Sequence, residues 1–380
     1  MKKHCFIILL FWVVLCTLTI AVAEEQNTVS FGDYTYAVLD DGTAEIVKYS
    51  GMNENLVIPG EFNGLVVSSI GDFAFIVNSN LTNVTIPDSV SSIGDGAFYS
   101  RKNLTSATIP ESITFIGDDT FSGCSSLTSI TIPSNIVFIG NRTFASCSSL
   151  ISVTIPDDVI SIGDRAFFSC NSLTSITVPD SVNYMGANPF AFCDNLTHIN
   201  VSADHPYLAT IDGVLFSKKD KRLICYPYAF SANEYMIPNG IRVIGDDAFH
   251  SCDSLINIII PDSVTSIGNN AFFSCGSLSS IAIPDSVTCI GDYAFFSCKS
   301  LTSVTIPKSV TVIGDNAFNS CSNLTSITIP DSVISIGDRA FSGCNHLTSV
   351  IVGRDSYARQ YCIDNDLPYA YADQNDWLNN

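Results

Sequence analysis

A period of 23 residues runs through most of this chain and restricts its possible folds more than any other feature. Prolines repeat at this step in two groups: Pro87, Pro110, Pro133, Pro156 and Pro179, then Pro238, Pro261, Pro284, Pro307 and Pro330. Isoleucine-glycine pairs repeat likewise, at 93–94, 116–117, 139–140, 162–163, 244–245, 267–268, 290–291, 313–314 and 336–337. Such regularity is typical of proteins in which equal structural units stack along one axis.

Each unit has the pattern of a short strand followed by a tight return path. In the unit that begins at Leu301, Pro307 ends the strand because proline cannot donate a hydrogen bond to a neighbouring strand. Gly314 permits a turn that a side chain would crowd, and Asp315 is expected to cap that turn with its carboxylate. The side chains expected to point inward are Leu301, Val304, Ile306, Val310, Ile313, Ala317, Phe318 and Cys321.

One unit alone cannot bury enough apolar surface to offset the conformational entropy that is lost when its backbone becomes ordered. Stacking removes this limit, because each unit then covers its neighbour and adds a parallel backbone ladder with a spacing of ~4.8 Å. The repeat therefore predicts a mainly β solenoid with a sheet of parallel strands and covered ends.

The units, which read Leu-Thr-Ser-Ile-Thr-Ile-Pro-x-Ser-Val-x-x-Ile-Gly-Asp-x-Ala-Phe-x-x-Cys, resemble those of the BspA-like leucine-rich-repeat surface proteins of bacteria. The resemblance extends over nearly the whole chain after its N-terminal segment. It implies a curved leucine-rich-repeat superhelix, exposure at the cell surface and adhesion to host or matrix proteins. It implies no catalytic residue.

Residues 1–23 have the pattern of a secretory signal peptide. Lys2 and Lys3 precede an apolar stretch, and Ala21-Val22-Ala23 forms a small-x-small cleavage site before Glu24. Leu15 before Cys16 disfavours a lipid anchor, since such signals require a small residue there. No later apolar segment approaches the ~18 residues of a membrane helix. A secreted or cell-surface protein without a membrane span is expected.

The remaining chain divides into five predicted segments. They are an N-terminal cap with a β-hairpin (24–66), a first repeat block (67–195), an insert (196–237), a second repeat block (238–352) and a C-terminal cap and tail (353–380). In the insert, 205–216 and 223–228 are expected to form two strands joined by a charged turn. In the C-terminal cap, Ser356 is expected to begin a helix whose Tyr357 and Tyr361 lie on one side.

The net charge of -20 at pH 7 argues against nucleic acid or acidic lipid as a partner, because both require clustered basic residues. Charged residues nevertheless form only 14% of the chain and hydrophobic ones 46%, so an acidic disordered tail is excluded.

Nine cysteines follow the repeat and should form one column inside the solenoid: Cys124, Cys147, Cys170, Cys193, Cys252, Cys275, Cys298, Cys321 and Cys344. Export would ordinarily suggest disulfides. Equivalent side chains on stacked coils point in parallel, however, whereas a disulfide requires them to face each other. Buried free thiols are therefore predicted, and a zinc site is disfavoured because its ligands must converge on one point.

Two columns of aspartates also follow the repeat. One follows the Ile-Gly pair: Asp72, Asp95, Asp118, Asp164, Asp246, Asp292, Asp315 and Asp338. The other follows the proline: Asp88, Asp157, Asp180, Asp262, Asp285 and Asp331. Rows of carboxylates could recruit calcium. The favoured interpretation is that each aspartate caps its own turn, so no metal site is predicted.

Two surfaces are candidates for ligand binding. The first is a row of outward hydroxyls on the strands: Ser106, Thr108, Ser129, Thr131, Ser175, Thr177, Ser303, Thr305, Ser326 and Thr328. The second is the charged turn of the insert, with Lys218, Lys219, Lys221 and Arg222. This turn is either an exposed tip whose lysines keep its strands from pairing with other chains, or a contact for an acidic partner. The hydroxyl row lacks the aromatic and arginine anchors that normally provide affinity.

The sequence thus predicts a protein that binds other proteins, with adhesion to host or matrix components as the expected role. The alternative is an architectural surface-layer or spacer protein without a specific host ligand. No cofactor and no catalytic residue are predicted, since no motif places a serine or cysteine nucleophile beside His198, His205, His250 or His346.

Overall fold

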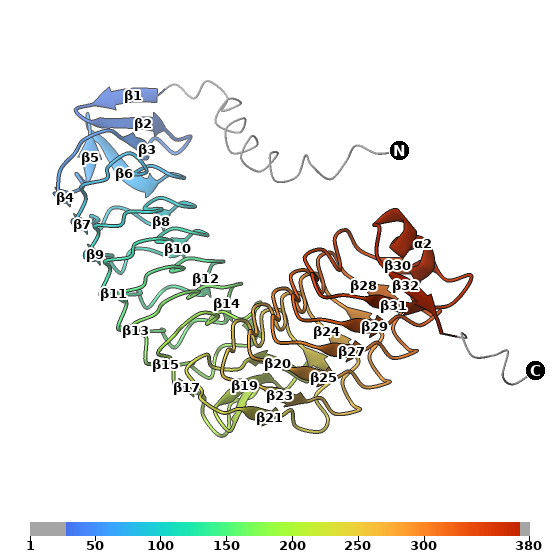
Figure 1. Cartoon of the computed structure of the whole chain (residues 1–380). Coiled ribbons are helices and arrows are strands. Elements are labelled where there is room, and N and C mark those ends of the chain that lie inside the picture. Colours follow the sequence, from blue (N-terminus) through green and yellow to red (C-terminus); the bar gives the residue numbers. More distant parts are fainter. Residues whose placement is uncertain (1–27, 373–380) are drawn as a thin grey trace, which may run out of the picture.

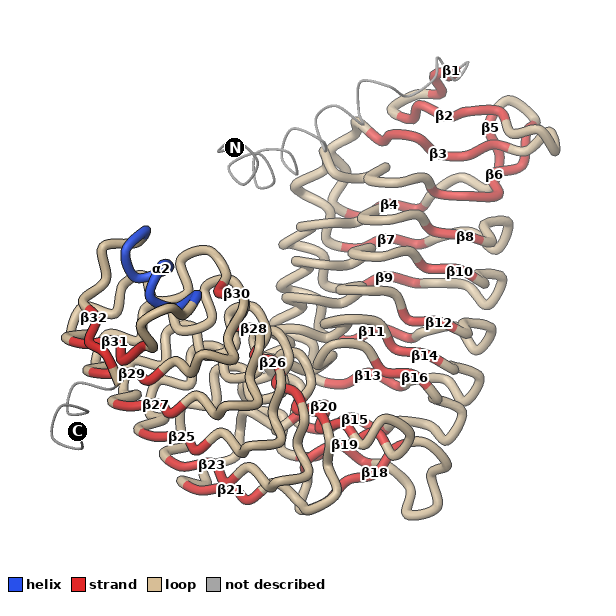
Figure 2. Tube along the Cα trace, turned by 90° about the vertical axis from the view of Figure 1, so that its right-hand side faces the viewer, coloured by secondary structure: helices blue, strands red, loops and turns tan. Residues whose placement is uncertain are grey.

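The computed structural model describes residues 28–372, so the predicted signal peptide lies outside the described residues. The chain winds into a mainly β solenoid of two arms that meet at an angle (Figure 1). The expected fold class is confirmed. Each coil contributes two short strands joined by turns, and the strands form rows along both arms (Figure 2).

The strands before the prolines, with the equivalent strands at 198–200 and 349–352, form what we call the first face. In the first arm they are β4 (Asn55–Val57), β7 (Asn83–Thr85), β9 (Ser106–Thr108), β11 (Ser129–Thr131), β13 (Ser152–Thr154), β15 (Ser175–Thr177) and β17 (His198–Asn200). In the second arm they are β21 (Glu234–Met236), β23 (Asn257–Ile259), β25 (Ser280–Ala282), β27 (Ser303–Thr305), β29 (Ser326–Thr328) and β31 (Ser349–Val352).

The strands before the Ile-Gly turns form the second face. They are β6 (Leu65–Ile70), β8 (Ser92–Ile93), β10 (Phe115–Ile116), β12 (Phe138–Ile139), β14 (Ser161–Ile162) and β16 (Tyr184–Met185) in the first arm. In the second arm they are β20 (Arg222–Cys225), β22 (Val243–Ile244), β24 (Ser266–Ile267), β26 (Cys289–Ile290), β28 (Val312–Ile313) and β30 (Ser335–Ile336). The segments from the Ile-Gly pair to the cysteine form the third side, the turn side.

The core consists of columns of identical side chains. All eight positions that were expected to point inward in the unit from Leu301 are at most 4% exposed. Phenylalanines stack in two columns, Phe75 to Phe190 and Phe249 to Phe341, with ring centroids 4.9 to 5.9 Å apart. The spacing follows the rung spacing of a parallel ladder, so each ring covers the ring of the next coil.

The expectation that each aspartate after an Ile-Gly pair caps its own turn is wrong. Its carboxylate instead accepts the backbone N–H of the equivalent residue in the next coil, as Asp292 Oδ1 does from Asp315 N at 2.8 Å. The same bond joins coils throughout both arms at 2.7 to 2.8 Å. Asn141 and Asn269 fill gaps in the column with their amide oxygens.

This bond requires glycine in the Ile-Gly pair, as expected, because the coils approach closely there. A Cβ at Gly314 would lie 2.5 Å from Asp292 N and from the Asp292 carboxylate. Such a distance is well inside van der Waals contact, so no side chain fits between the coils.

The predicted column of buried thiols is confirmed for eight of the nine cysteines, whereas Cys344 in the last coil is half-buried. Each Sγ lies near the carbonyl oxygen of an aromatic residue in the preceding coil, at 3.0 to 3.9 Å. Burial raises the pKa of Cys124 and of Cys193 to about 12. These thiols therefore remain protonated at neutral pH, which makes them poor nucleophiles.

The insert contains three antiparallel strands, so the expected pair is wrong. They are β18 (Leu208–Ile211), β19 (Val214–Ser217) and β20. The segment expected to be one strand breaks at Asp212 and Gly213, both of which have positive φ. This two-residue turn matches an Asp-Gly hairpin signal.

This insert explains the angle between the arms (Figure 1). On the second face, β20 pairs with β22 and so adds, at the start of the second arm, a rung that the turn side lacks. On the turn side, the arms bond directly, because Asn188 N donates to Asp246 O at 3.3 Å. The insert therefore widens the stack on one side only and turns the second arm relative to the first.

An ion pair between a half-buried guanidinium and a buried carboxylate holds this junction. The Arg165 guanidinium donates two hydrogen bonds to the Asp247 carboxylate, both at 2.8 Å, and His250 Nδ1 lies 2.8 Å from the same carboxylate. The Asp247 side chain is 1% exposed. Burial alone would raise the pKa of Asp247, but the hydrogen bonds from His250 and Arg165 outweigh it and lower that pKa below its ordinary value.

Both ends are covered as the fold class predicts. At the N-terminus, β2 (Tyr34–Val38) and β3 (Ala44–Tyr49) form the expected hairpin, which β1 (Thr28–Phe31) flanks on one side and β6 on the other. A further short strand, β5 (Glu61–Phe62), pairs with β6. At the C-terminus, helix α2 (Tyr357–Asp364) is followed by β32 (Tyr369–Tyr371). Within the described residues, no helix is long and apolar enough to cross a membrane.

The C-terminal helix begins as predicted. Ser356 accepts a hydrogen bond from Arg359 N, and the Tyr361 hydroxyl accepts one from Ala340 N in the last coil. The expected packing of Tyr357 is wrong, because its side chain is 47% exposed and Ala358 is buried instead.

A Gly314→Ala variant should test the close approach of the coils. We expect the free energy of unfolding to fall by about 2–4 kcal/mol, because the new methyl group would meet backbone atoms that cannot move aside. Gly60→Ala is a matched control, since the nearest atom to its Cβ would be Ser89 Oγ at 3.5 Å. Urea unfolding should show a change within about 0.5 kcal/mol for that control. Equal losses in the two variants would contradict the explanation.

An Arg165→Ala variant should test the junction. It leaves the Asp247 carboxylate buried without its guanidinium partner, so we expect a loss of about 2–4 kcal/mol in urea unfolding at pH 7. The loss should shrink at acidic pH. A carboxyl whose pKa is lowered by folding contributes its full stability only at a pH above the ordinary pKa of aspartate, and this contribution disappears as the carboxyl is protonated.

Arg142→Ala is its matched control. Arg142 pairs with Asp119 in a similar two-point geometry, but the two side chains are 44% and 20% exposed. We expect that loss to stay below about 1 kcal/mol. Similar losses for Arg165→Ala and Arg142→Ala would show that the junction pair has no special role.

Candidate protein-binding surfaces

The first face exposes hydroxyls as the sequence predicts, and most of them lack a partner within the described chain. The outward side chains are exposed in Ser106, Thr108, Ser129, Thr131, Ser175, Thr177, Ser303 and Thr305, and half-buried in Ser326 and Thr328. Ser106 donates to Asn83 Oδ1, and Thr177 accepts from Asn200 Nδ2. The hydroxyls of the other eight make no hydrogen bond among residues 28–372, so these hydroxyls remain available to a ligand.

The threonine one residue before β9, β27 and β29 is engaged within the stack. Thr302 Oγ1 donates to Ser279 O at 3.3 Å, and Thr325 Oγ1 donates to Thr302 O at 3.2 Å. These bonds join consecutive coils. The hydroxyls of these threonines therefore join coils and do not add to the row of hydroxyls that is free for a ligand.

The hydroxyl row is interrupted where the second arm begins. Met236 and Ile259 are paired in register on β21 and β23 and are 65% and 38% exposed. They stand where other strands have threonine. The first face is thus polar over most of both arms, with a small apolar area close to the junction.

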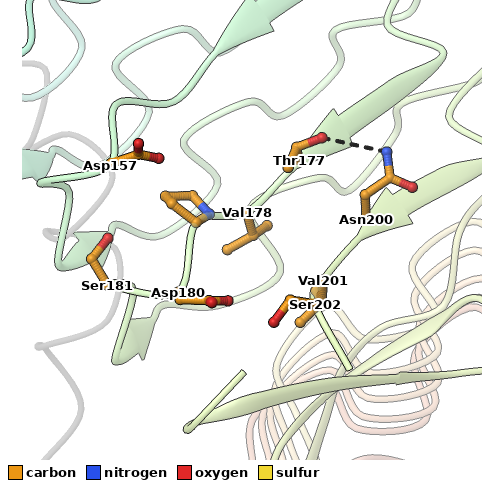
Figure 3. A pocket seen from close by; sticks show the side chains of 9 residues that line it. Asp157, Thr177, Val178, Asp180, Ser181, Asn200, Val201 and Ser202 are labelled. Atoms are coloured by element: carbon orange, nitrogen blue, oxygen red, sulfur yellow. Dashed lines mark hydrogen bonds between the residues drawn. The ribbon is translucent and has the colours of Figure 1, made fainter. Parts of the chain in front are cut away.

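An open groove of about 590 Å³ lies at the edge of the first face where the first arm ends (Figure 3). Its lining includes the carboxylates of Asp157 and Asp180 and the hydroxyls of Ser181 and Ser202. Carboxylates and hydroxyls accept hydrogen bonds, so the groove suits an amino or hydroxyl group of a partner.

The basic turn of the insert is only partly a free tip. Lys219 and Lys221 are exposed. Lys218 Nζ donates to His205 O at 2.6 Å, and Arg222 Nη2 donates to Met185 O at 2.6 Å. Arg222 therefore joins the insert to the last coil of the first arm, a role that the sequence does not reveal.

Both aspartate columns lie at the surface, but their surroundings differ. The aspartates after the prolines are exposed. In the other column, burial raises the pKa of Asp95, and the neighbouring charges of Asp72, Asp118 and Asp119 raise it further against the hydrogen bond from Asp118 N. Across residues 28–372, no group of three or more histidine, cysteine or acidic side chains could hold a metal ion.

Each of the four histidines among residues 28–372 has a structural contact. His205 Nε2 lies 3.0 Å from Pro179 O, and His346 Nδ1 lies 2.6 Å from Ser322 O. His198 Nδ1 lies 2.7 Å from the adjacent Thr197 Oγ1. His250 at the junction contacts the Asp247 carboxylate through Nδ1, while its buried Nε2 has no hydrogen-bond partner among residues 28–372.

The second face contains exposed aromatic side chains that the sequence reasoning missed. Phe115, Phe138 and Tyr184 are 53%, 56% and 57% exposed. The signal was present in the repeat, because other units have Ser92, Ser161, Ser266 or Ser335 at this position. Comparison of the units at outward positions would have found it.

The comparisons with known proteins agree with this architecture. A family model described as the BspA type leucine-rich repeat region matches residues 68–197, 138–221 and 224–362. A leucine-rich cell surface protein from Faecalibacterium prausnitzii is 33% identical, with a TM-score of 0.70, over 90% of this chain and 98% of that chain. Among curated proteins, no relative is found.

Two further solved structures are similar. A leucine-rich repeat protein from Eubacterium ventriosum is 26% identical over 84% of this chain and 82% of that chain, with a TM-score of 0.57. The pneumococcal vaccine antigen PcpA shares the fold, with a TM-score of 0.68 and 22% identity over 86% of this chain and 87% of that chain.

Substitution of Asp95 should separate its hydrogen bond from its charge. Asn preserves the acceptor, as Asn141 does naturally, so Asp95→Asn should unfold at the wild-type temperature or above at pH 7. Because the pKa of Asp95 is raised in the folded state, its charged carboxylate destabilises the wild type at neutral pH and does so less as the pH falls. The difference in unfolding temperature between Asp95→Asn and the wild type should therefore vanish near pH ~4. Asp95→Ala loses the acceptor and should cost about 1 kcal/mol. An equal fall in the unfolding temperature of Asp95→Asn and Asp95→Ala would contradict this account.

Proposed function

Because this chain belongs to the BspA-type leucine-rich repeat family, we propose that it is a secreted or cell-surface protein that binds other proteins, with host or matrix components as its partners. The observation that supports this most directly is the first face. Its unpaired hydroxyls repeat from coil to coil in both arms, whereas the interior and the turn side are occupied by stacking.

A solenoid face suits protein binding because its side chains are held in place before a partner arrives. Little conformational entropy is then lost on association. Hydroxyls alone make weak anchors, so we expect modest affinity for each contact and stronger attachment where many copies act together. The similar protein from Faecalibacterium prausnitzii is described as a cell surface protein, which supports the same location here.

The test is direct binding of residues 24–380 to purified fibronectin, laminin and collagen by biolayer interferometry, with fragments of the producer's own cell wall alongside. We expect binding to at least one matrix protein. A double variant, Ser129→Glu with Ser303→Glu, places a charge on the first face of each arm and should weaken binding about tenfold or more.

Ile334→Glu is the control, because Ile334 is 69% exposed and lies next to β30 on the second face. It adds a similar charge elsewhere and should leave binding unchanged. Association with wall fragments or with itself alone would instead favour the architectural role. Equal affinity of the double variant and the wild type would remove the first face from the proposal.

A further inference from the structure

The second face of the first arm has an apolar stripe that the repeat does not require. It consists of the exposed rings of Phe115, Phe138 and Tyr184, with the half-buried Val137 and Ile160 beside them. Serine, valine or cysteine occupies the aromatic position in other units, so the coils stack there without these rings. Exposed aromatic side chains leave apolar surface in water, which a solenoid has no structural reason to repeat.

The members of this stripe lie on successive rungs. Strands β12, β14 and β16 pair in parallel, which places Phe138, Ser161 and Tyr184 in one row. Strand β10, with Phe115, lies next to β12 in the same stack (Figure 1). Ser161 lies on the rung between Phe138 and Tyr184, so an apolar side chain of a partner placed over Ser161 would meet a ring on either side.

A basic cluster continues this stripe at the junction. Arg222 bonds to Met185 O, which places β20 beside the rung of Tyr184. Lys221 precedes Arg222, and its carbonyl oxygen accepts a hydrogen bond from Arg242 N at 2.8 Å. Lys221 and Arg242 therefore lie on adjacent rungs. The basic cluster consists of Lys219, Lys221 and Arg242, all of which are exposed.

The charge of this cluster differs from that of the rest of the molecule. The chain has 17 basic and 37 acidic residues, so three exposed cations on one surface are a local exception. Asp220 in the same turn offsets one of these charges, and its carboxylate lies 3.3 Å from Ser217 Oγ. An acidic partner is repelled by most of the surface and attracted here, which determines where and in which orientation it docks.

We infer that the second face from β10 to β22 binds an extended segment of a partner protein, with apolar side chains on the aromatic stripe and acidic side chains on the basic cluster. This inference rests on the proposed function and identifies the chemistry of the partner. Three rung steps of ~4.8 Å separate Phe115 from Tyr184, or roughly 14 Å, which about four residues of an extended segment span before the segment reaches the basic cluster. Aromatic and arginine side chains are the usual anchors of such contacts.

The experiment uses residues 24–380 and a fluorescein-labelled peptide of about twelve residues, with leucines in its first half and glutamates in its second half. A second peptide has lysines in place of the glutamates. Fluorescence anisotropy should show binding of the glutamate peptide and no binding of the lysine peptide. A triple variant, Phe115→Ser, Phe138→Ser and Tyr184→Ser, and a charge variant, Lys219→Glu, Lys221→Glu and Arg242→Glu, should each raise the Kd about tenfold or more.

Two controls keep folding and general charge effects apart from binding. Ile334→Ser removes an exposed apolar side chain next to the second face of the other arm, and Lys308→Glu reverses an exposed charge after a proline. Both should bind the glutamate peptide like the wild type. Unchanged thermal unfolding of the triple variant is expected, because serine is the residue of other units.

Three outcomes would overturn the inference. One is equal affinity of the triple variant and the wild type for the glutamate peptide. Another is that only the charge variant weakens binding and that heparin binds to the same cluster, which would assign the cluster to anionic polysaccharides. The third is failure of the wild type to bind the glutamate peptide while it still binds matrix proteins, which would leave the proposed function standing and remove only this surface.

Discussion

The structure depends on the close stacking of coils of equal length. At each Ile-Gly turn the backbone of one coil meets that of the next, and the carboxylate of one coil accepts an N–H from its neighbour, as between Asp292 and Asp315. Glycine is required because any Cβ would collide there. The phenylalanine and cysteine columns follow from the same register, since identical positions lie one above another.

The junction shows what happens when this rule is broken on one side only. The strands of the insert add a rung on the second face, whereas the turn side stacks without interruption. The bend brings Arg165 to Asp247 in a coil 82 residues later, and this pair replaces contacts that regular stacking would provide. The angle between the arms is thus a consequence of where extra residues were added.

Function is restricted to what stacking leaves free. The interior is filled, and on the turn side much of the hydrogen-bonding capacity joins coils, so a ligand meets mainly the two strand faces. The first face repeats the same hydroxyls, which favours broad and weak contacts. The second face departs from the repeat at Phe115, Phe138 and Tyr184, and such departures are the places where one partner can be told from another.

The sequence alone determined the period, the inward side chains, the thiol column, the N-terminal hairpin and the start of the C-terminal helix at Ser356, because each follows from local pattern or from equal spacing. Only the tertiary structure decided what lies across each column. The carboxylate of Asp292 meets the next coil, Arg222 meets Met185, and Tyr357 faces solvent while Ala358 is buried. A repeat specifies which residues share a column, but contacts between coils, and at the insert where the period fails, depend on distances that exist only once the coils are stacked.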